Sequence, residues 1–182
     1  MIEMRFHGRG GQGAVTSAEL VAQAAIDSGK YATAFPSFGP ERRGAPVVAF
    51  ARVDEQPVRL RSKIYNPDVV IVLDPSLLEI ANPIEGLRAA GVLVVNSSHG
   101  AEELKKRLGY KGKIALVDAS RIAREVIGLP ITNTTMVGAL VKSVEMLSLA
   151  SLKEPFQKRF GKLAARNIEA MERAYNETTL FG

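Results

Sequence analysis

Three short, continuous apolar runs constrain the fold of this chain more than any other feature of its sequence. They occupy residues 69–73 (VVIVL), 92–95 (VLVV) and 114–117 (IALV), and each is followed directly by a polar residue. A strand with one wet face alternates apolar and polar residues, whereas a strand covered on both faces is apolar throughout. The runs therefore predict buried parallel strands joined by crossover helices. Asp74 and Asp118, which follow two of the runs, are interpreted as helix caps.

The other strand signals predict that the sheet is mixed. Residues 2–6 alternate apolar and polar side chains, and residues 31–35 form a further candidate strand. Residues 47–53 and 58–61 flank the sequence DEQP, and the second of these segments alternates apolar residues with arginines. We therefore predict an antiparallel hairpin over these two segments, beside the parallel strands.

Helical spacing dominates the end of the chain. We predict that Asn133 is the N-cap of a helix whose apolar positions are Met136, Leu140, Val144 and Leu147. Gly138 inside this helix costs about 1 kcal/mol relative to alanine, which a close approach of another element would justify. Together the signals predict one α/β domain over residues 1–182. Its expected form is a three-layer, Rossmann-like, mixed and mostly parallel sheet with flanking helices and a helical C-terminal third.

Composition excludes several classes of protein. The chain contains no cysteine, so it can hold no disulfide, thiolate nucleophile or cysteine-ligated iron–sulfur cluster of its own. No apolar stretch approaches the ~20 residues of a membrane span, and we expect a soluble, cytoplasmic protein that binds no membrane. The net charge is +5, but only 6% of residues are aromatic and none interleaves with a basic cluster, which argues against nucleic-acid binding. A basic surface also suits an acidic partner.

The first candidate site is the segment HGRGGQGAVT near the N-terminus. Its loop residues, all candidates for cofactor binding, are Gly8, Arg9, Gly10, Gly11, Gln12 and Gly13. Backbone N–H groups between a strand and a helix attract anions, most often phosphate. The glycine spacing also matches a dinucleotide fingerprint, so a stand-alone Rossmann-like nucleotide-binding protein is one interpretation. The chain lacks the acidic residue that should end the second strand and hold the ribose, and a tight turn without any ligand is another interpretation.

The second candidate site is the stiff loop FPSFGPERRGAP. It contributes Glu41, Arg42, Arg43 and Gly44 as further candidates for cofactor binding. Arginine offers planar, bidentate contacts to carboxylate or phosphate, and the prolines favour a loop that holds its position for an anion or a partner subunit. His7 is interpreted as a packing residue. We find no metal-ligand spacing and no nucleophile–base arrangement, so no catalytic or metal-binding residue is assigned.

Five motifs carry a resemblance to a known family over nearly the whole chain. They are FHGRGGQGAVT, AFPSFGPERRGAPVVAF, RLRS, PDVVIVLD and ITNTTMVGAL. In this order they resemble the gamma subunit of pyruvate:ferredoxin oxidoreductase (pyruvate synthase) and its 2-oxoacid relatives. The resemblance implies an enzyme of several chains that converts a 2-oxoacid, CoA and oxidised ferredoxin into acyl-CoA, carbon dioxide and reduced ferredoxin. The substrate is expected to be pyruvate, although the motifs do not separate it from other 2-oxoacids.

The resemblance also implies partners and cofactors. Alpha, beta and delta-type subunits are expected beside this chain, with ferredoxin as acceptor, and the complex is expected to use thiamine diphosphate, magnesium, iron–sulfur clusters and CoA as co-substrate. This chain has neither a cysteine nor a Gly-Asp-Gly sequence, the start of the usual thiamine diphosphate motif. We therefore expect it to be inactive alone. Either its two loops help to hold a phosphate, such as one of CoA, or the chain is an assembly scaffold that binds no ligand.

Overall fold

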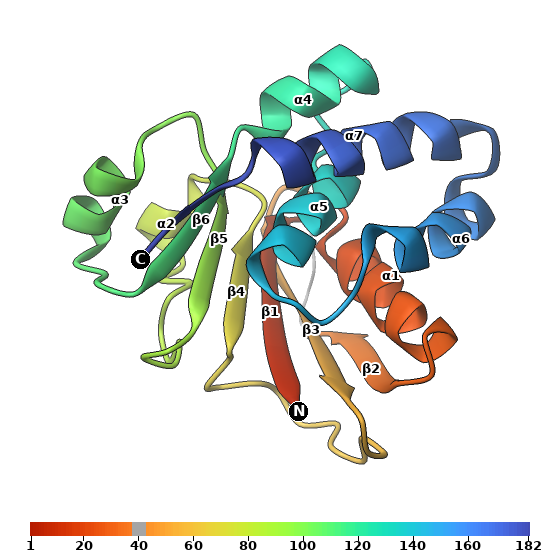
Figure 1. Ribbon diagram of the computed structural model, residues 1–182. Coiled ribbons are helices and arrows are strands. Elements are labelled where there is room, and N and C mark those ends of the chain that lie inside the picture. Colours follow the sequence, from red (N-terminus) through yellow and green to blue (C-terminus); the bar gives the residue numbers. More distant parts are fainter. Residues whose placement is uncertain (38–42) are drawn as a thin grey trace.

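The computed structural model describes residues 1–37 and 43–182, which build a seven-stranded sheet in the order β2-β3-β1-β4-β5-β6-β7 (Figure 1). The strands are β1 (Ile2–Arg9), β2 (Tyr31–Pro36), β3 (Pro46–Asp54), β4 (Val69–Val72), β5 (Val92–Asn96), β6 (Lys113–Val117) and β7 (Thr179–Phe181). Strands β1, β4, β5 and β6 pair in parallel. Strand β3 runs antiparallel to both β1 and β2, and β7 runs antiparallel to β6. The prediction of a mixed, mostly parallel sheet is confirmed.

Helices lie on both faces of the sheet. They are α1 (Ala14–Asp27), α2 (Leu77–Ile80), α3 (Ala101–Leu108), α4 (Ala119–Val126), α5 (Asn133–Ser143), α6 (Leu149–Phe160), the 3₁₀ turn η1 (Gly161–Leu163) and α7 (Ala164–Glu177). The larger core cluster joins one face of the sheet to α1, α4, α5, α6 and α7. A smaller cluster joins the other face of β4, β5 and β6 to α2 and α3. The apolar runs at β4, β5 and β6 are buried on both faces because each face has its own helical layer.

The predicted hairpin is wrong. Residues 57–61 form no strand, and β3 instead pairs with β1 along one edge and with β2 along the other. Because both edges of β3 carry backbone partners, a strand from the following segment has no place beside it. The alternating side chains Arg59, Leu60 and Arg61 are all exposed. The alternation in this segment therefore marks no buried face.

The helical C-terminal third forms with two differences from its prediction. Helix α5 ends at Ser143, so Val144 and Leu147 lie beyond it, and its N-cap is Thr132, which makes Asn133 the first residue of the helix rather than its cap. The short strand β7 ends the chain, which the sequence pattern did not indicate. Gly138 has the close neighbour that its position predicted, because a Cβ there would lie 2.0 Å from the carbonyl oxygen of Met171 in α7.

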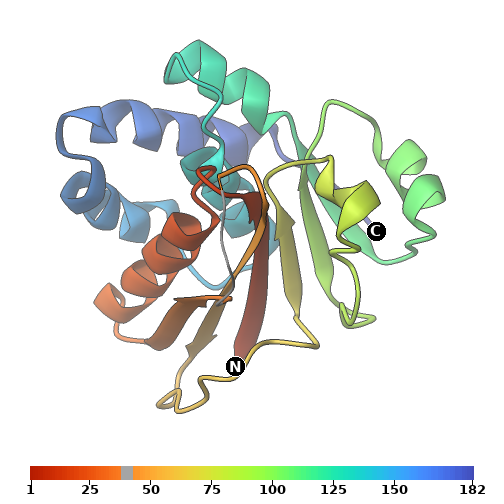
Figure 2. The same cartoon turned by 180° about the vertical axis from the view of Figure 1, so that it is seen from behind.

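Within residues 1–37 and 43–182, one part of the sheet has no helix over it. Seen from behind, α2 and α3 lie on the side of β4, β5 and β6, and no helix of the described residues covers this face of β1, β3 and β2 (Figure 2). This uncovered side nevertheless holds the buried side chains of Arg5, His7 and Arg52.

Candidate functional site

The two loops that the sequence singled out lie against each other. Gly10 donates from its backbone N–H to the carbonyl of Ala45 at 2.8 Å, and Gly44 donates to the carbonyl of Gly10 at 3.1 Å. Arg9 Nη1 adds a 3.0 Å hydrogen bond to the carbonyl of Gly44. The glycine loop after β1 and the residues that lead into β3 therefore form one joined surface, although 35 positions separate Arg9 from Gly44 in sequence.

Two side chains of the glycine loop tie it to the end of β4. Arg9 Nε donates to Asp74 Oδ2 at 3.1 Å, and Gln12 Nε2 donates to the same oxygen at 2.8 Å. Gln12 Oε1 accepts the backbone N–H of Arg9 at 2.6 Å, so this side chain also closes its own loop. Ser76 donates from its hydroxyl and its backbone N–H to the other oxygen of Asp74. The side chains of Arg9 and Gln12 thus brace the loop.

Hydrogen bonding outweighs burial at Asp74. Partial burial acts to raise the pKa of this carboxyl, but the hydrogen bonds from Ser76 and Gln12 and the charge of Arg9 together lower it below its usual value. Asp74 is therefore ionised at neutral pH and attracts both donors of the glycine loop.

The prediction that Asp118 caps a helix is confirmed, since its Oδ1 accepts the backbone N–H of Arg121 in α4 at 2.9 Å. Asp74 has the different role of joining two strand ends.

The N-terminus of α1 offers backbone N–H donors beside the hydrogen bonds that join Arg9 and Gln12 to Asp74. Ser17 is the first residue of the helix whose backbone N–H donates to a carbonyl oxygen, that of Gly13 at 2.9 Å. The N–H groups of Ala14, Val15 and Thr16 consequently have no carbonyl partner among residues 1–37 and 43–182. Three free donors at the positive end of a helix dipole can bind an oxyanion such as a phosphate.

A buried amide from α5 packs against this helix start. Asn133 is only 6% exposed, and its Oδ1 has no hydrogen-bond partner in the described part of the chain. A Cβ on Gly13 would lie 2.5 Å from Asn133 Nδ2, so only glycine fits there, and its φ of +81° also favours glycine. The sequence offered Asn133 as a helix cap and gave no sign of this long-range contact.

The predicted site residues therefore fall into five groups. Gly10 and Gly44 join the loops through their backbones, and Arg9 and Gln12 bind Asp74. Arg43 is exposed beside the joined loops. Gly11 and Gly13 shape the turn with φ of +92° and +81°, whereas Gly8 lies within β1, paired with Val47. Glu41 and Arg42 lie outside the described residues.

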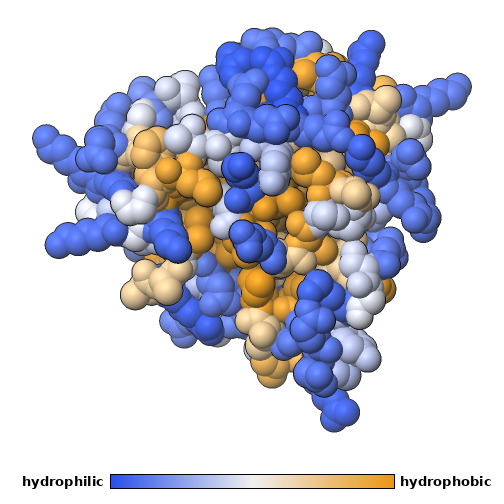
Figure 3. Space-filling model, in the orientation of Figure 1, coloured by the Kyte–Doolittle hydropathy of each residue, from blue (hydrophilic) through white to orange (hydrophobic). Residues whose placement is uncertain are grey.

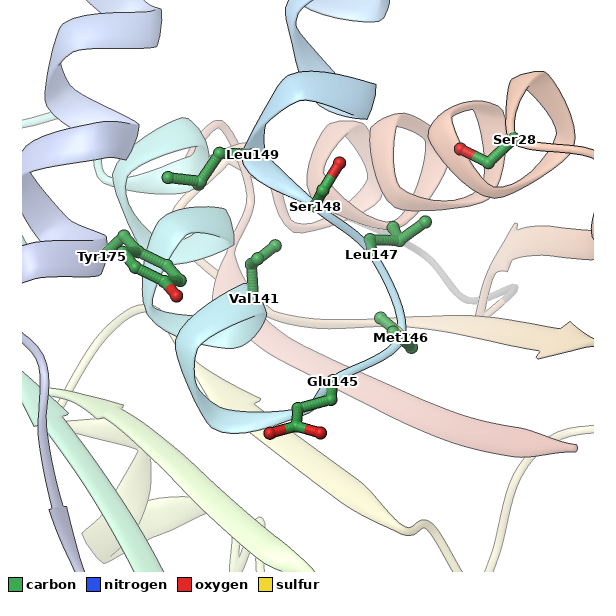
Figure 4. A pocket seen from close by; sticks show the side chains of 8 residues that line it. All are labelled: Ser28, Val141, Glu145, Met146, Leu147, Ser148, Leu149 and Tyr175. Atoms are coloured by element: carbon green, nitrogen blue, oxygen red, sulfur yellow. The ribbon is translucent and has the colours of Figure 1, made fainter.

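A separate hollow opens on the helical face. Its volume is about 630 Å³, and it lies where apolar side chains gather in the middle of that face (Figure 3). Val141, Leu149 and Tyr175 lie around one side of it, and Glu145 lies on the loop that follows α5 (Figure 4). Among the described residues that line it, only Glu145 and Tyr175 are titratable, and they form no acid–base pair with each other. This hollow therefore offers no catalytic arrangement.

None of the described helices is long and apolar enough to cross a bilayer.

The comparisons with known proteins all point to one protein family. The family model for pyruvate ferredoxin/flavodoxin oxidoreductase matches residues 3–177. A relative from Thermococcus kodakarensis, the pyruvate/ketoisovalerate oxidoreductases common subunit gamma, is 51% identical and covers 100% of this chain and 99% of its own length. Pyruvate synthase subunit PorC of Methanothermobacter thermautotrophicus is 48% identical, covering 97% of this chain and 96% of its own.

A solved structure shares the whole fold. Pyruvate oxidoreductase subunit PORC from Thermotoga maritima superposes with a TM-score of 0.89 at 38% identity, and the match covers 100% of this chain and 98% of that one. The similarity includes the mixed sheet and the helical C-terminal third, so the architecture is that of the relatives from end to end.

Proposed function

The chain belongs to the pyruvate ferredoxin/flavodoxin oxidoreductase family, as a gamma-type subunit, and from this premise we propose that it completes a multi-subunit enzyme that oxidises pyruvate. In that reaction pyruvate, CoA and oxidised ferredoxin give acetyl-CoA, carbon dioxide and reduced ferredoxin. The observation that carries the proposal is the 51% identity to a gamma subunit over essentially the full length of both chains. We propose the cytoplasm as its location, because a chain without cysteine needs no oxidising compartment.

The partners in this proposal are alpha, beta and delta-type subunits, with ferredoxin as electron acceptor. Thiamine diphosphate with magnesium would supply stabilisation of a carbanion, and iron–sulfur clusters would carry electrons. This chain has no cysteine to ligate a cluster. Its described residues also present no paired nucleophile and base in the joined loops. The proposed division of labour leaves both cofactors on the partner subunits.

We propose that this chain contributes an anion site at the joined loops. The free N–H groups of Ala14, Val15 and Thr16 would bind a phosphate of CoA, and the exposed guanidinium of Arg43 would add charge from the neighbouring loop. The hydrogen bonds from Arg9 and Gln12 to Asp74 support this assignment, because they hold the loop in one position before a ligand arrives. Such preorganisation lowers the cost of binding.

A stand-alone dinucleotide enzyme fits the topology less well. In a Rossmann fold the strand that follows the first helix lies directly beside β1, runs parallel to it and ends near the glycine loop with an acidic residue that holds the ribose. Here the strand after α1 is β2, and the antiparallel β3 separates it from β1 and begins beside the loop, with Pro46 paired to Arg9. That end of the strand therefore provides no acidic residue for a ribose.

The experiment is to co-express this chain with the candidate partners and to measure pyruvate- and CoA-dependent reduction of ferredoxin. We expect turnover by the complex and none by the isolated chain, and robust turnover by the isolated chain would sink the proposal. The variant Arg43→Ala should raise the Michaelis constant for CoA with kcat unchanged. Lys162→Ala, an exposed cation on η1, is the matched control. If Arg43→Ala impairs assembly and leaves the CoA constant unchanged, the scaffold interpretation replaces the anion site.

A further inference from the structure

On the side of β1, β3 and β2 that lacks a helix, the cation Arg5 is buried and forms no salt bridge with any described residue. Arg5 is 9% exposed, and its Nε donates to His7 Nε2 at 3.0 Å. Its Nη2 donates to the carbonyl oxygens of Pro83 and Glu85. All these acceptors are uncharged, and no carboxylate of the described chain lies within salt-bridge distance of Arg5. Its neighbour Arg52, in contrast, pairs with Glu3 at 2.7 Å.

His7 does not supply the missing charge. Burial, reinforced by the positive charge of Arg5, lowers the pKa of His7 to about 3, so the ring is neutral at physiological pH. Because Nε2 accepts the hydrogen bond from Arg5, the proton of the neutral ring lies on Nδ1, which is therefore a donor. The charge of Glu85 partly offsets the burial of Arg5, but burial still lowers the pKa of the guanidinium. A further anion close to this buried cation would therefore be favourable.

A small cavity opens beside these two side chains. It has a volume of about 180 Å³, and its polar lining residues include Arg5, His7, Ser37, Lys63, Asn82 and Glu85. Sites for whole cofactors or drug-sized ligands usually measure about 300–1,000 Å³, so this cavity suits a single side chain better than a free cofactor. The positive groups Arg5 and Lys63 outnumber the one carboxylate in the lining, which is that of Glu85.

The chain segment that leads into the lining of the cavity at Lys63 is also basic. The segment that crosses this side of the sheet exposes Arg59, Arg61 and Lys63, and none of them has a salt-bridge partner within residues 1–37 and 43–182. The same segment exposes two large apolar or aromatic side chains, Leu60 at 51% and Tyr65 at 71%. Exposed aromatic residues among unpaired cations are typical of a surface that binds another protein.

We propose that this side of the sheet docks an acidic segment of a partner subunit, and that one carboxylate of that segment enters the cavity between Arg5, His7 and Lys63. The charge of the surface selects the occupant, because a carboxylate would compensate the buried guanidinium and accept from His7 Nδ1 and Lys63. The exposed Leu60 and Tyr65 would be covered at the same time. This proposal rests on the proposed function, and it identifies the face of the subunit that contacts a partner subunit.

The test uses the assembled complex and a carbodiimide reagent, which joins an amine directly to a carboxylate that touches it. We expect Lys63 to form a cross-link with an acidic residue of a partner subunit, identified by mass spectrometry of the joined peptides. The variant Lys63→Arg keeps the charge and should abolish that cross-link while the complex remains intact. Lys162, on the opposite helical layer, should form no cross-link with the same partner segment.

Charge reversal provides the second measurement. The double variant Arg61→Glu and Lys63→Glu should weaken association at low salt by about tenfold or more, and the cross-linked acidic residue changed to lysine should restore it. Lys162→Glu should leave association unchanged. A complex that forms and turns over but gives no cross-link at Lys63 would overturn the docking surface and leave the proposed function intact. A cross-link to a second copy of this chain would overturn it as well. Failure of the native chain to assemble would count against the proposed function instead.

Discussion

Gln12 Nε2 donates a 2.8 Å hydrogen bond to Asp74 Oδ2, which fixes the glycine loop to the end of β4 across 62 positions of sequence. Arg9 Nε reaches the same oxygen at 3.1 Å. The loop that the sequence presents as a glycine-rich turn is thus held by one carboxylate. Two parallel neighbours, β1 and β4, bring these side chains together at their carboxyl ends.

Replacing that carboxylate should loosen the loop. We expect Asp74→Asn to lower the free energy of unfolding by about 1–3 kcal/mol, because it removes hydrogen bonds to a charged acceptor. It should also speed tryptic cleavage after Arg9, since the arginine side chain loses its partner. Asp118→Asn is the matched control, as it removes a helix cap and leaves the brace intact. Equal cleavage after Arg9 in both variants would show that Asp74 does not hold the loop.

Two glycines of the loop should respond differently to alanine. Gly11 and Gly13 both have positive φ, of +92° and +81°. A Cβ on Gly11 meets nothing within 4 Å, whereas one on Gly13 lies 2.5 Å from Asn133 Nδ2. We expect Gly11→Ala to cost about 1–2 kcal/mol from backbone strain alone and Gly13→Ala to cost clearly more. Adding Asn133→Ala should recover part of the loss only at Gly13, as measured by denaturant unfolding.

Gly138 should tolerate no side chain. In Gly138→Ala the new methyl group would lie 2.0 Å from the carbonyl oxygen of Met171, so α5 and α7 would have to move apart. This overpacking should cost about 1–3 kcal/mol, more than the roughly 1 kcal/mol that alanine gains in helix propensity. Thermal unfolding measures the difference. Gly100→Ala, where a Cβ meets nothing within 4 Å, should change the melting temperature less.

His7 should make the fold sensitive to mild acid. The unfolded chain binds a proton at His7 near pH 6.5, whereas burial beside Arg5 lowers the pKa in the folded chain to about 3. Between these values the unfolded state holds more protons, so stability falls as pH falls. From pH 7 to pH 5 this effect amounts to about 2 kcal/mol.

The check on His7 compares slopes rather than absolute stabilities. His7→Gln keeps an acceptor for Arg5 and should remove this part of the acid sensitivity in denaturant unfolding at pH 7 and pH 5. His99→Gln should keep the full sensitivity, because the His99 side chain is 61% exposed. The assignment is wrong if the two variants lose stability equally between these pH values.

Several features of the fold could be predicted from local sequence alone. The runs at β4, β5 and β6 are apolar at every position, and only strands covered on both faces require that pattern. The glycine loop before α1 and the helices of the last third were likewise readable, because propensity and helical spacing act within one segment. The absence of cysteine excluded a cluster on this chain without reference to any structure.

The hairpin shows where local patterns fail. Residues 58–61 alternate as a strand would, but pairing depends on which strand edges are free, and β1 and β2 occupy both edges of β3. The prediction for Asn133 is wrong for a related reason. Its position suited a helix cap, yet its side chain packs against Gly13, which no local rule can anticipate.

The sequence by itself determined the buried strands, the glycine turn and the positions of the helices, because each depends on neighbours within a few residues. Only the tertiary structure decided that Asp74 holds Arg9 and Gln12, that Asn133 lies under the start of α1, and that Arg5 is buried with no salt-bridge partner among residues 1–37 and 43–182. Such contacts join segments that lie far apart in sequence. Their energies depend on burial and on distance between side chains, and these exist only once the chain has folded.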